Sequence, residues 1–110
     1  MMRLMITLAL LLALAACGKS AEQKQREENA VLTQLGEKYV REKILEPGQA
    51  QFRNQFIGKG GAPCGEVNAK DAFGAYIGYQ RYISVARDLT LLAQDVSPAE
   101  FEAQWQQLCR

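Results

Sequence analysis

The 110-residue sequence contains no histidine. Histidine is the side chain that most often serves as a general base, a proton shuttle or a zinc ligand near neutral pH. Its absence excludes Ser-His-Asp triads, Cys-His nucleophile pairs and zinc sites built on imidazole, whatever the fold. We therefore expect a binding or structural protein and not an enzyme.

An excess of charge of one sign is also missing, since 13 Lys and Arg residues face 12 Asp and Glu residues. A nucleic-acid-binding protein needs a basic face that displaces counterions from phosphates. A nearly neutral chain lacks the charge for such a face. We therefore expect no nucleic-acid partner.

The sequence has no apolar run of the roughly 20 residues that a membrane-spanning helix requires. Its longest run extends from Leu4 to Ala16, is broken only by Thr7, and follows Arg3. A basic residue before a short apolar stretch that ends in small residues is typical of a secretory signal peptide. We predict that residues 1–16 are such a signal and not a membrane-spanning helix.

The residues that close this run, Leu14-Ala15-Ala16-Cys17, resemble the lipobox of bacterial lipoproteins. The resemblance implies lipid transfer to the Cys17 sulfur, cleavage between Ala16 and Cys17, and acylation of the new amine. Several acyl chains on one residue anchor a protein stably, whereas one chain is marginal. The next residue is Gly18 and not Asp, which by analogy with enteric sorting rules implies the periplasmic face of the outer membrane.

The rest of the chain is the size of one domain. Residues 17–29 are polar and of mixed charge, which predicts a lipidated N-terminus and tether, and residues 30–110 form the single domain. From Ala30, the apolar residues Val31, Leu35 and Tyr39 recur every four positions. This spacing predicts an amphipathic helix that ends at Pro47-Gly48 and covers its own sheet.

Period-two alternation over residues 52–57, a Gly-rich turn over 58–63, and strand-like runs over 64–69, 73–86 and 89–93 predict three or four strands. Ser97, Pro98 and Glu100 then supply a cap, a proline at the first helical position and an acid at the third, which predict a C-terminal helix. With hairpin-length connections, this order predicts an α+β fold whose helices share one side of a small antiparallel sheet.

The long run over residues 73–86 presents two different faces. The predicted core face consists of Phe73, Ile77, Ile83 and Val85, packed against Val31, Leu35, Tyr39, Phe101 and Trp105. The other face carries Tyr76, Gln80 and Tyr82, which with the Gly58–Gly61 loop form the candidate recognition surface, because tyrosines offer large contact area at low entropic cost. The alternative is that a helix also covers this face and the tyrosines are core.

Two cysteines remain once Cys17 carries lipid. Cys64 and Cys109 are an even pair in an exported domain, and the default state of such a pair is a disulfide. A catalytic thiol would need a base to form the thiolate, and two cysteines are too few for a metal site. We predict a structural disulfide, and no catalytic residue, metal or cofactor.

Glu66 lies two residues from Cys64 along the same strand. If the disulfide turns Cys64 toward the C-terminal helix, Glu66 is drawn toward that interface and needs a partner, for which Arg81 is the candidate. The alternative is that Glu66 and Asp71 form an acid-base pair that acts on cell-wall glycan. Two nearby acids in a neutral domain are ordinarily surface groups, so we favour the first interpretation.

The segment Cys64–Tyr82, CGEVNAKDAFGAYIGYQRY, resembles a set of small uncharacterised bacterial and phage-associated proteins with the pattern CGxVNxKNxxGGYxG. In this chain Asp71 replaces the second Asn and Ala75 the second Gly of the Gly-Gly pair. The resemblance implies no activity. We expect a membrane-anchored binding or structural module whose partner is an envelope protein or cell-wall component. The alternatives are a phage-type exclusion or inhibitor lipoprotein, and an enzyme that acts on envelope glycan.

Replacing Cys17 with Ser is expected to leave an unprocessed precursor, because a hydroxyl cannot accept the thioether-linked lipid and cleavage waits for that step. Gel mobility and incorporation of labelled palmitate measure the two events. Normal cleavage and labelling of the variant would contradict the lipoprotein interpretation.

Overall fold

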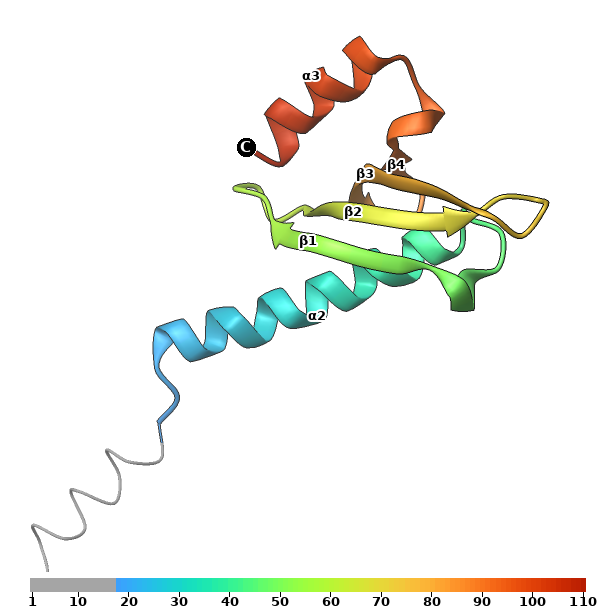
Figure 1. Cartoon of the computed structure of the whole chain (residues 1–110). Helices are drawn as coiled ribbons and strands as arrows, with labels where there is room; N and C mark the ends of the chain where they lie inside the picture. Colours follow the sequence, from blue (N-terminus) through green and yellow to red (C-terminus); the bar gives the residue numbers. More distant parts are fainter. Residues whose placement is uncertain (1–17) are drawn as a thin grey trace, which may run out of the picture.

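The computed structural model describes residues 18–110, so Ala16, Cys17 and the predicted cleavage position lie outside the described residues. The elements are α2 (Ala21–Arg41), η1 (Pro47–Gln49), β1 (Gln51–Ile57), β2 (Pro63–Lys70), β3 (Tyr76–Ala86), β4 (Leu89–Leu92), η2 (Ala93–Asp95) and α3 (Pro98–Leu108) (Figure 1). The four strands form one antiparallel sheet in sequence order. The predicted α+β class is thus confirmed. No helix within residues 18–110 is long and apolar enough to cross a membrane.

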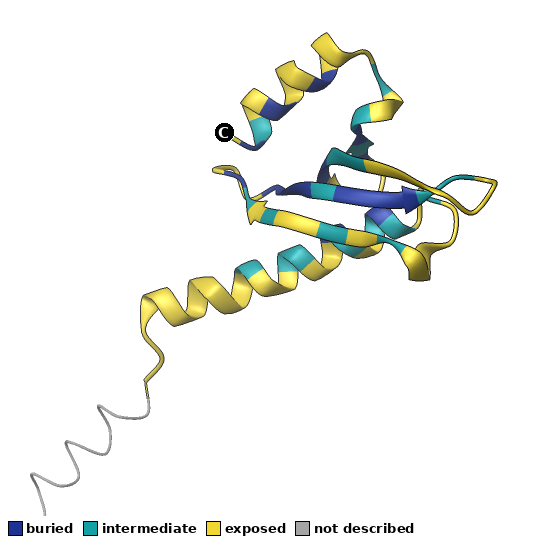
Figure 2. Cartoon of the chain, viewed as in Figure 1, coloured by how far each residue is buried: buried dark blue, intermediate teal, exposed yellow. Residues whose placement is uncertain are grey.

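The helix α2 begins nine residues earlier than the predicted start at Ala30 and ends before Pro47. The Ser20 hydroxyl accepts a hydrogen bond from the Gln23 amide and caps the helix. The following polar residues are good helix formers, with Glu22 in the first turn, where the helix dipole favours an acid. The segment predicted as a tether is therefore mostly helical. Residues 18–28 are all exposed, and this end of α2 extends beyond the sheet (Figures 1 and 2).

The two helices lie on opposite faces of the sheet and not on one side, as Figure 1 shows. Successive strand residues point to opposite faces, so adjacent residues of β3 enter different cores. Tyr82 packs in a cluster on the α2 side, and Ile83 packs in a cluster on the α3 side. The α2 cluster comprises Val40, Val67, Tyr82 and Leu92, and the α3 cluster comprises Ala62, Cys64, Ile83, Phe101, Trp105 and Cys109.

The predicted core face of residues 73–86 is wrong except for Ile83. Phe73, Ile77 and Val85 are 95%, 54% and 48% exposed. Phe73 lies in the turn before β3, and the α3 cluster includes only the part of this face near Ile83. The alternating apolar pattern of residues 73–86 therefore extends beyond the part of the sheet that α3 covers.

The face of α2 that contacts the sheet also differs from the prediction. Gly36 and Val40 are buried, whereas Val31 and Leu35 are 57% and 38% exposed, and Tyr39 is half-buried. A Cβ built on Gly36 would lie 2.6 Å from the Cβ of Pro63, so only glycine allows this close approach of helix and strand. The close contact at Gly36 sets the rotation of the helix and turns Val31 away from the sheet.

The predicted disulfide between Cys64 and Cys109 is confirmed, and both cysteines are buried. It joins β2 to the C-terminal end of α3. Next to it, a Cβ on Gly58 would lie 2.1 Å from the carbonyl oxygen of Leu108. The disulfide and this backbone contact together hold the end of α3 against the sheet.

Replacing both Cys64 and Cys109 with Ala is expected to lower the free energy of unfolding by about 4 kcal/mol, because the bond closes a loop between residues separated by 45 positions. For a domain of this size, the melting temperature falls by more than about 10 °C. Denaturant titration and calorimetry measure both quantities. Wild-type protein under reducing conditions serves as the matched control, and an unchanged midpoint in either sample would contradict the structural role.

Candidate functional site

The three residues of the predicted recognition surface do not share one exposed surface. Tyr76 is exposed, and its hydroxyl donates to the Gln49 carbonyl oxygen at 2.8 Å. Gln80 is half-buried, and its side-chain oxygen accepts from the Gln94 amide. Tyr82 is only 1% exposed, so its assignment to a binding surface is wrong. The alternative that a helix covers this face is correct at Tyr82, because α2 packs there.

Tyr82 is a structural residue of the α2 cluster. Its ring packs edge to face against the Phe52 ring, with the two ring centroids 5.8 Å apart, and its hydroxyl accepts a hydrogen bond from the Gln55 side-chain amide. Burial raises the pKa of Tyr82 above its ordinary value, so the hydroxyl remains protonated near neutral pH. A Cβ on Gly65 would lie 2.9 Å from the Tyr82 hydroxyl oxygen, which explains a glycine in the middle of β2.

Glu66 and Arg81 face each other in the register of β2 and β3, but they are not the predicted buried pair. Glu66 forms its ion pair with Arg53 at 3.4 Å, and Arg81 forms its own with Glu102 at 2.8 Å. All four side chains retain contact with solvent. The Arg81 guanidinium also lies over the Trp105 ring at 4.9 Å.

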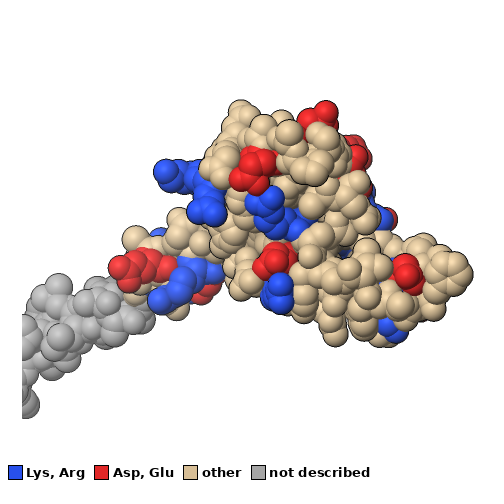
Figure 3. Space-filling model, turned by 45° about the horizontal axis from the view of Figure 1, so that its top comes forward, with Lys and Arg blue, Asp and Glu red and all other residues tan. Residues whose placement is uncertain are grey.

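These four residues, Arg53, Glu66, Arg81 and Glu102, form what we call the charged row, which runs from β1 across the sheet to α3. Figure 3 shows basic and acidic side chains next to one another across the middle of the molecule, without a large area of one sign. The charged row covers the part of the sheet beyond the α3 cluster. Within the charged row, each basic side chain is paired with an acidic one.

The environment of Glu66 keeps its carboxyl group ionised. A hydrogen bond from Asn54, followed by that from Arg53, lowers the pKa of Glu66 below its ordinary value of 4.5. A general acid for glycan cleavage needs a raised pKa. Asp71 follows β2, and its side chain accepts from the amides of Phe73 and Ala75 in the β2–β3 turn.

The two acids are also far apart, because an extended strand rises about 3.3 Å per residue and the five steps from Glu66 to Asp71 span about 16 Å. Carboxylate pairs in glycoside hydrolases are separated by about 5 to 9.5 Å. Glu66 and Asp71 therefore do not form the closely spaced pair that the glycan-cleaving alternative requires.

Several exposed apolar side chains belong to segments at the end of the sheet away from the start of α2 (Figure 1). Phe73, Tyr76 and Ile77 come from the β2–β3 hairpin, and Leu45 from the loop after α2. One shallow depression is lined by Leu45, Glu46, Asp71, Ala72 and Gly74. We call Leu45, Phe73, Tyr76 and Ile77 the distal cluster.

Local structure holds Phe73 at the tip of the hairpin. Its amide donates to the Asp71 carboxylate at 2.9 Å, and Gly74 takes a positive φ of 81° that completes the turn. Phe73 and Ile77 were predicted to be core residues, and Tyr76 was the cluster residue that the sequence placed on an exposed surface. The Lys70-Asp71 pair and Gly74 are the turn signal that would have placed Phe73 outside the strand.

No protein-family model matches the sequence, and neither the curated proteins nor the solved structures include a significant match to the chain. Within the described residues, no group of three or more His, Cys, Asp or Glu side chains is arranged to hold a metal ion.

Replacing Asn54 with Gly is expected to raise the pKa of Glu66, because the largest cause of its lowering is removed while glycine still accepts the positive φ of 52° at this position. A lowered pKa stabilises the fold above the ordinary pKa of Glu, and this stabilisation is lost as the pH falls through the folded-state value. The difference in stability between wild type and variant therefore shrinks as the pH falls below about 4.

An NMR titration of the Glu66 carboxyl carbon measures the pKa, and denaturant melts at several pH values measure the stability. Glu66→Gln removes the titrating group and serves as the control for assignment. An identical Glu66 pKa in wild type and Asn54→Gly would contradict the assigned cause.

Proposed function

We propose that this chain is an envelope lipoprotein, in which residues 1–16 are removed, Cys17 carries the lipid, and the α+β domain is a non-enzymatic binding module. The lipobox Leu14–Cys17 after a basic residue and an apolar run supports the anchor. Removing Arg3 with the signal leaves 12 basic and 12 acidic residues, so lipid and not net charge would hold the domain at the membrane. We place it at the periplasmic face of the outer membrane.

The geometry of α2 is compatible with this anchor. Only three residues separate Cys17 from Ala21, where the helix begins, and residues 18–28 are exposed. At 1.5 Å per residue, the exposed turns over residues 21–28 extend about 12 Å before the helix reaches the sheet. The exposed turns provide a stem between a lipidated Cys17 and the folded domain.

The observation that carries the binding role is the distal cluster. Leu45 and the β2–β3 turn line one depression, exposed apolar side chains on such a surface mark interaction sites, and the turn around Asp71 holds Phe73 in a defined position. Phe73 is the most exposed of the large apolar side chains. We therefore propose that the distal cluster binds an envelope protein or a cell-wall component.

The runner-up function is a phage-type exclusion or inhibitor lipoprotein, and the motif in Cys64–Tyr82 is the feature that favours it. Such a protein would use the same surface against a receptor or a lytic enzyme. The identity of the captured partner separates the two candidates.

Replacing both Leu45 and Phe73 with Ala is expected to abolish partner capture without changing the fold, because both side chains are exposed. Loss of a central aromatic contact weakens binding by about 2 kcal/mol or more, which is roughly 30-fold. In-cell crosslinking of the lipoprotein followed by mass spectrometry measures capture, and thermal melting tests the fold. Val85→Ala, another exposed apolar residue outside the cluster, is the matched control. Equal loss in Val85→Ala, or no loss in the double variant, would contradict the proposed surface.

A further inference from the structure

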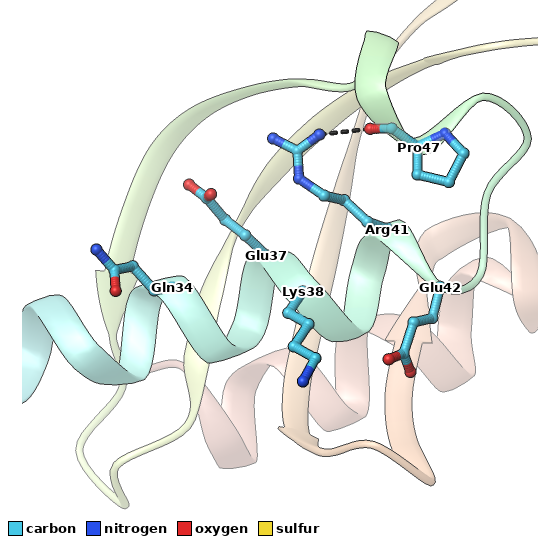
Figure 4. Close-up of a pocket in the computed structure, with 6 residues that line it drawn as sticks. All are labelled: Gln34, Glu37, Lys38, Arg41, Glu42 and Pro47. Carbon is cyan, nitrogen blue, oxygen red and sulfur yellow. Dashed lines mark hydrogen bonds between the residues drawn. The ribbon is translucent and has the colours of Figure 1, made fainter.

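The face of α2 opposite the sheet carries a regular pattern of exposed residues. Gly36 and Val40 contact the sheet, and the residues on the other side are exposed. These residues are separated by alternating steps of four and three, the heptad spacing of helices that pair along one seam. They are Lys24, Glu28, Val31, Leu35, Lys38 and Glu42, which we call the outer stripe. Figure 4 shows Lys38 and Glu42 projecting from the same side of α2, away from Glu37 and Arg41.

The outer stripe has an apolar centre and charged ends. Val31 and Leu35 lie one turn apart in the middle, both exposed. Each end of the outer stripe consists of a basic residue followed along the chain by an acidic one. Lys24 and Glu28 precede the apolar centre, and Lys38 and Glu42 follow it. When a second copy of the outer stripe is placed beside the first in the opposite chain direction, every basic position faces an acidic one. The pattern is therefore complementary to itself in the antiparallel direction.

We propose that the outer stripe is the interface between two copies of this chain, with their α2 helices antiparallel about a two-fold axis near residue 33. In this arrangement Lys24 faces Glu42 of the second copy and Glu28 faces Lys38. Val31 faces Leu35, so the apolar side chains meet at the centre. Such an interface uses one surface on both copies, as a two-fold dimer requires.

The charges select the antiparallel arrangement. In a parallel pair each outer-stripe residue faces its own equivalent, which brings together two Lys-Lys and two Glu-Glu layers. Like charges that face each other destabilise helix pairs. The same six residues therefore favour one orientation and oppose the other.

The charged side chains are available for this contact. Within residues 18–110, neither Glu28 nor Lys38 takes part in an ion pair. Glu42 pairs with Arg87 at 3.2 Å but remains partly exposed. The Arg87 contact holds Glu42 at the end of the outer stripe, where a lysine of the second copy can approach it.

Membrane anchoring would strengthen a small interface of this kind, and this step rests on the proposed lipid at Cys17. Two apolar residues per copy bury little surface, so the pair is weak in dilute solution. Tethering both copies to one membrane raises their effective concentration. From Ser20 to the axis near residue 33, the helix extends about 20 Å at 1.5 Å per residue. The two anchors would then lie about 40 Å apart and enter the same membrane if the axis is perpendicular to it.

Disulfide crosslinking of the full-length protein in isolated membranes tests the arrangement. Two differently tagged copies carry Val31→Cys and Leu35→Cys, and oxidation is expected to join them in at least fivefold higher yield than two copies of Val31→Cys. Equal yields, or a preference for the Val31→Cys pair, would overturn the antiparallel interface, as would no crosslink between copies. Palmitate labelling of the same bands tests the anchor separately. Lipidated protein without the crosslink overturns only the dimer, and crosslinked protein without lipid overturns only the anchor.

Charge exchange supplies a second test in the same crosslinking background. Glu28→Lys and Lys38→Glu, each made alone in both copies, place like charges in two layers and are expected to lower the yield at least fivefold. The variant with both changes restores opposite charges and is expected to return the yield to within twofold of the original. Lys59→Glu makes the same charge change in the β1–β2 turn and is the control. Single changes without effect, or a double change that does not restore the yield while circular dichroism shows an intact fold, would overturn the proposal.

Discussion

Burial of β2 and β3 on both faces is the constraint on which the rest of this structure depends. Adjacent residues of β3, Tyr82 and Ile83, enter two different cores, so each core requires its own helix. Burial of the sheet on both faces also accounts for a close contact on each face. Gly65 leaves room for the Tyr82 hydroxyl on one face, and the disulfide from Cys64 fixes α3 on the other. The two buried clusters lie on opposite faces of the sheet, so both helices are needed to cover it.

Because α3 covers only part of its face of the sheet, the rest of that face carries the charged row. The charged row begins where the α3 cluster ends. Arg81 contacts both groups, because its guanidinium lies over the Trp105 ring and forms an ion pair with Glu102. Glu66 is ionised because its partners, Asn54 and Arg53, are hydrogen-bond donors. The charged row is therefore a stabilised surface of the sheet, and both of its acids, Glu66 and Glu102, have a lowered pKa where a general acid needs a raised one.

Two groups among the exposed apolar residues within residues 18–110 suit different partners. The distal cluster lies on the loop after α2 and on the β2–β3 hairpin, with Phe73 at the tip of the hairpin. The outer stripe lies along α2 and has charges at both ends of its apolar centre. An isolated aromatic tip suits insertion into a pocket of another molecule, whereas a long self-complementary stripe suits a second copy of the same helix.

The sequence alone determined the α+β class, the succession of antiparallel strands along the chain, the N-cap of α3 at Ser97 and the Cys64–Cys109 bond. Each of these depends on local signals, namely alternation, capping residues and an even pair of cysteines. Only the tertiary structure decided which faces are covered. Alternation along β3 distinguishes its two faces but does not show that both are buried near Tyr82, nor that the cover ends before Ile77. Partners of Glu66 and Arg81 likewise come from β1 and α3, because their choice depends on how distant segments pack and not on spacing along one strand.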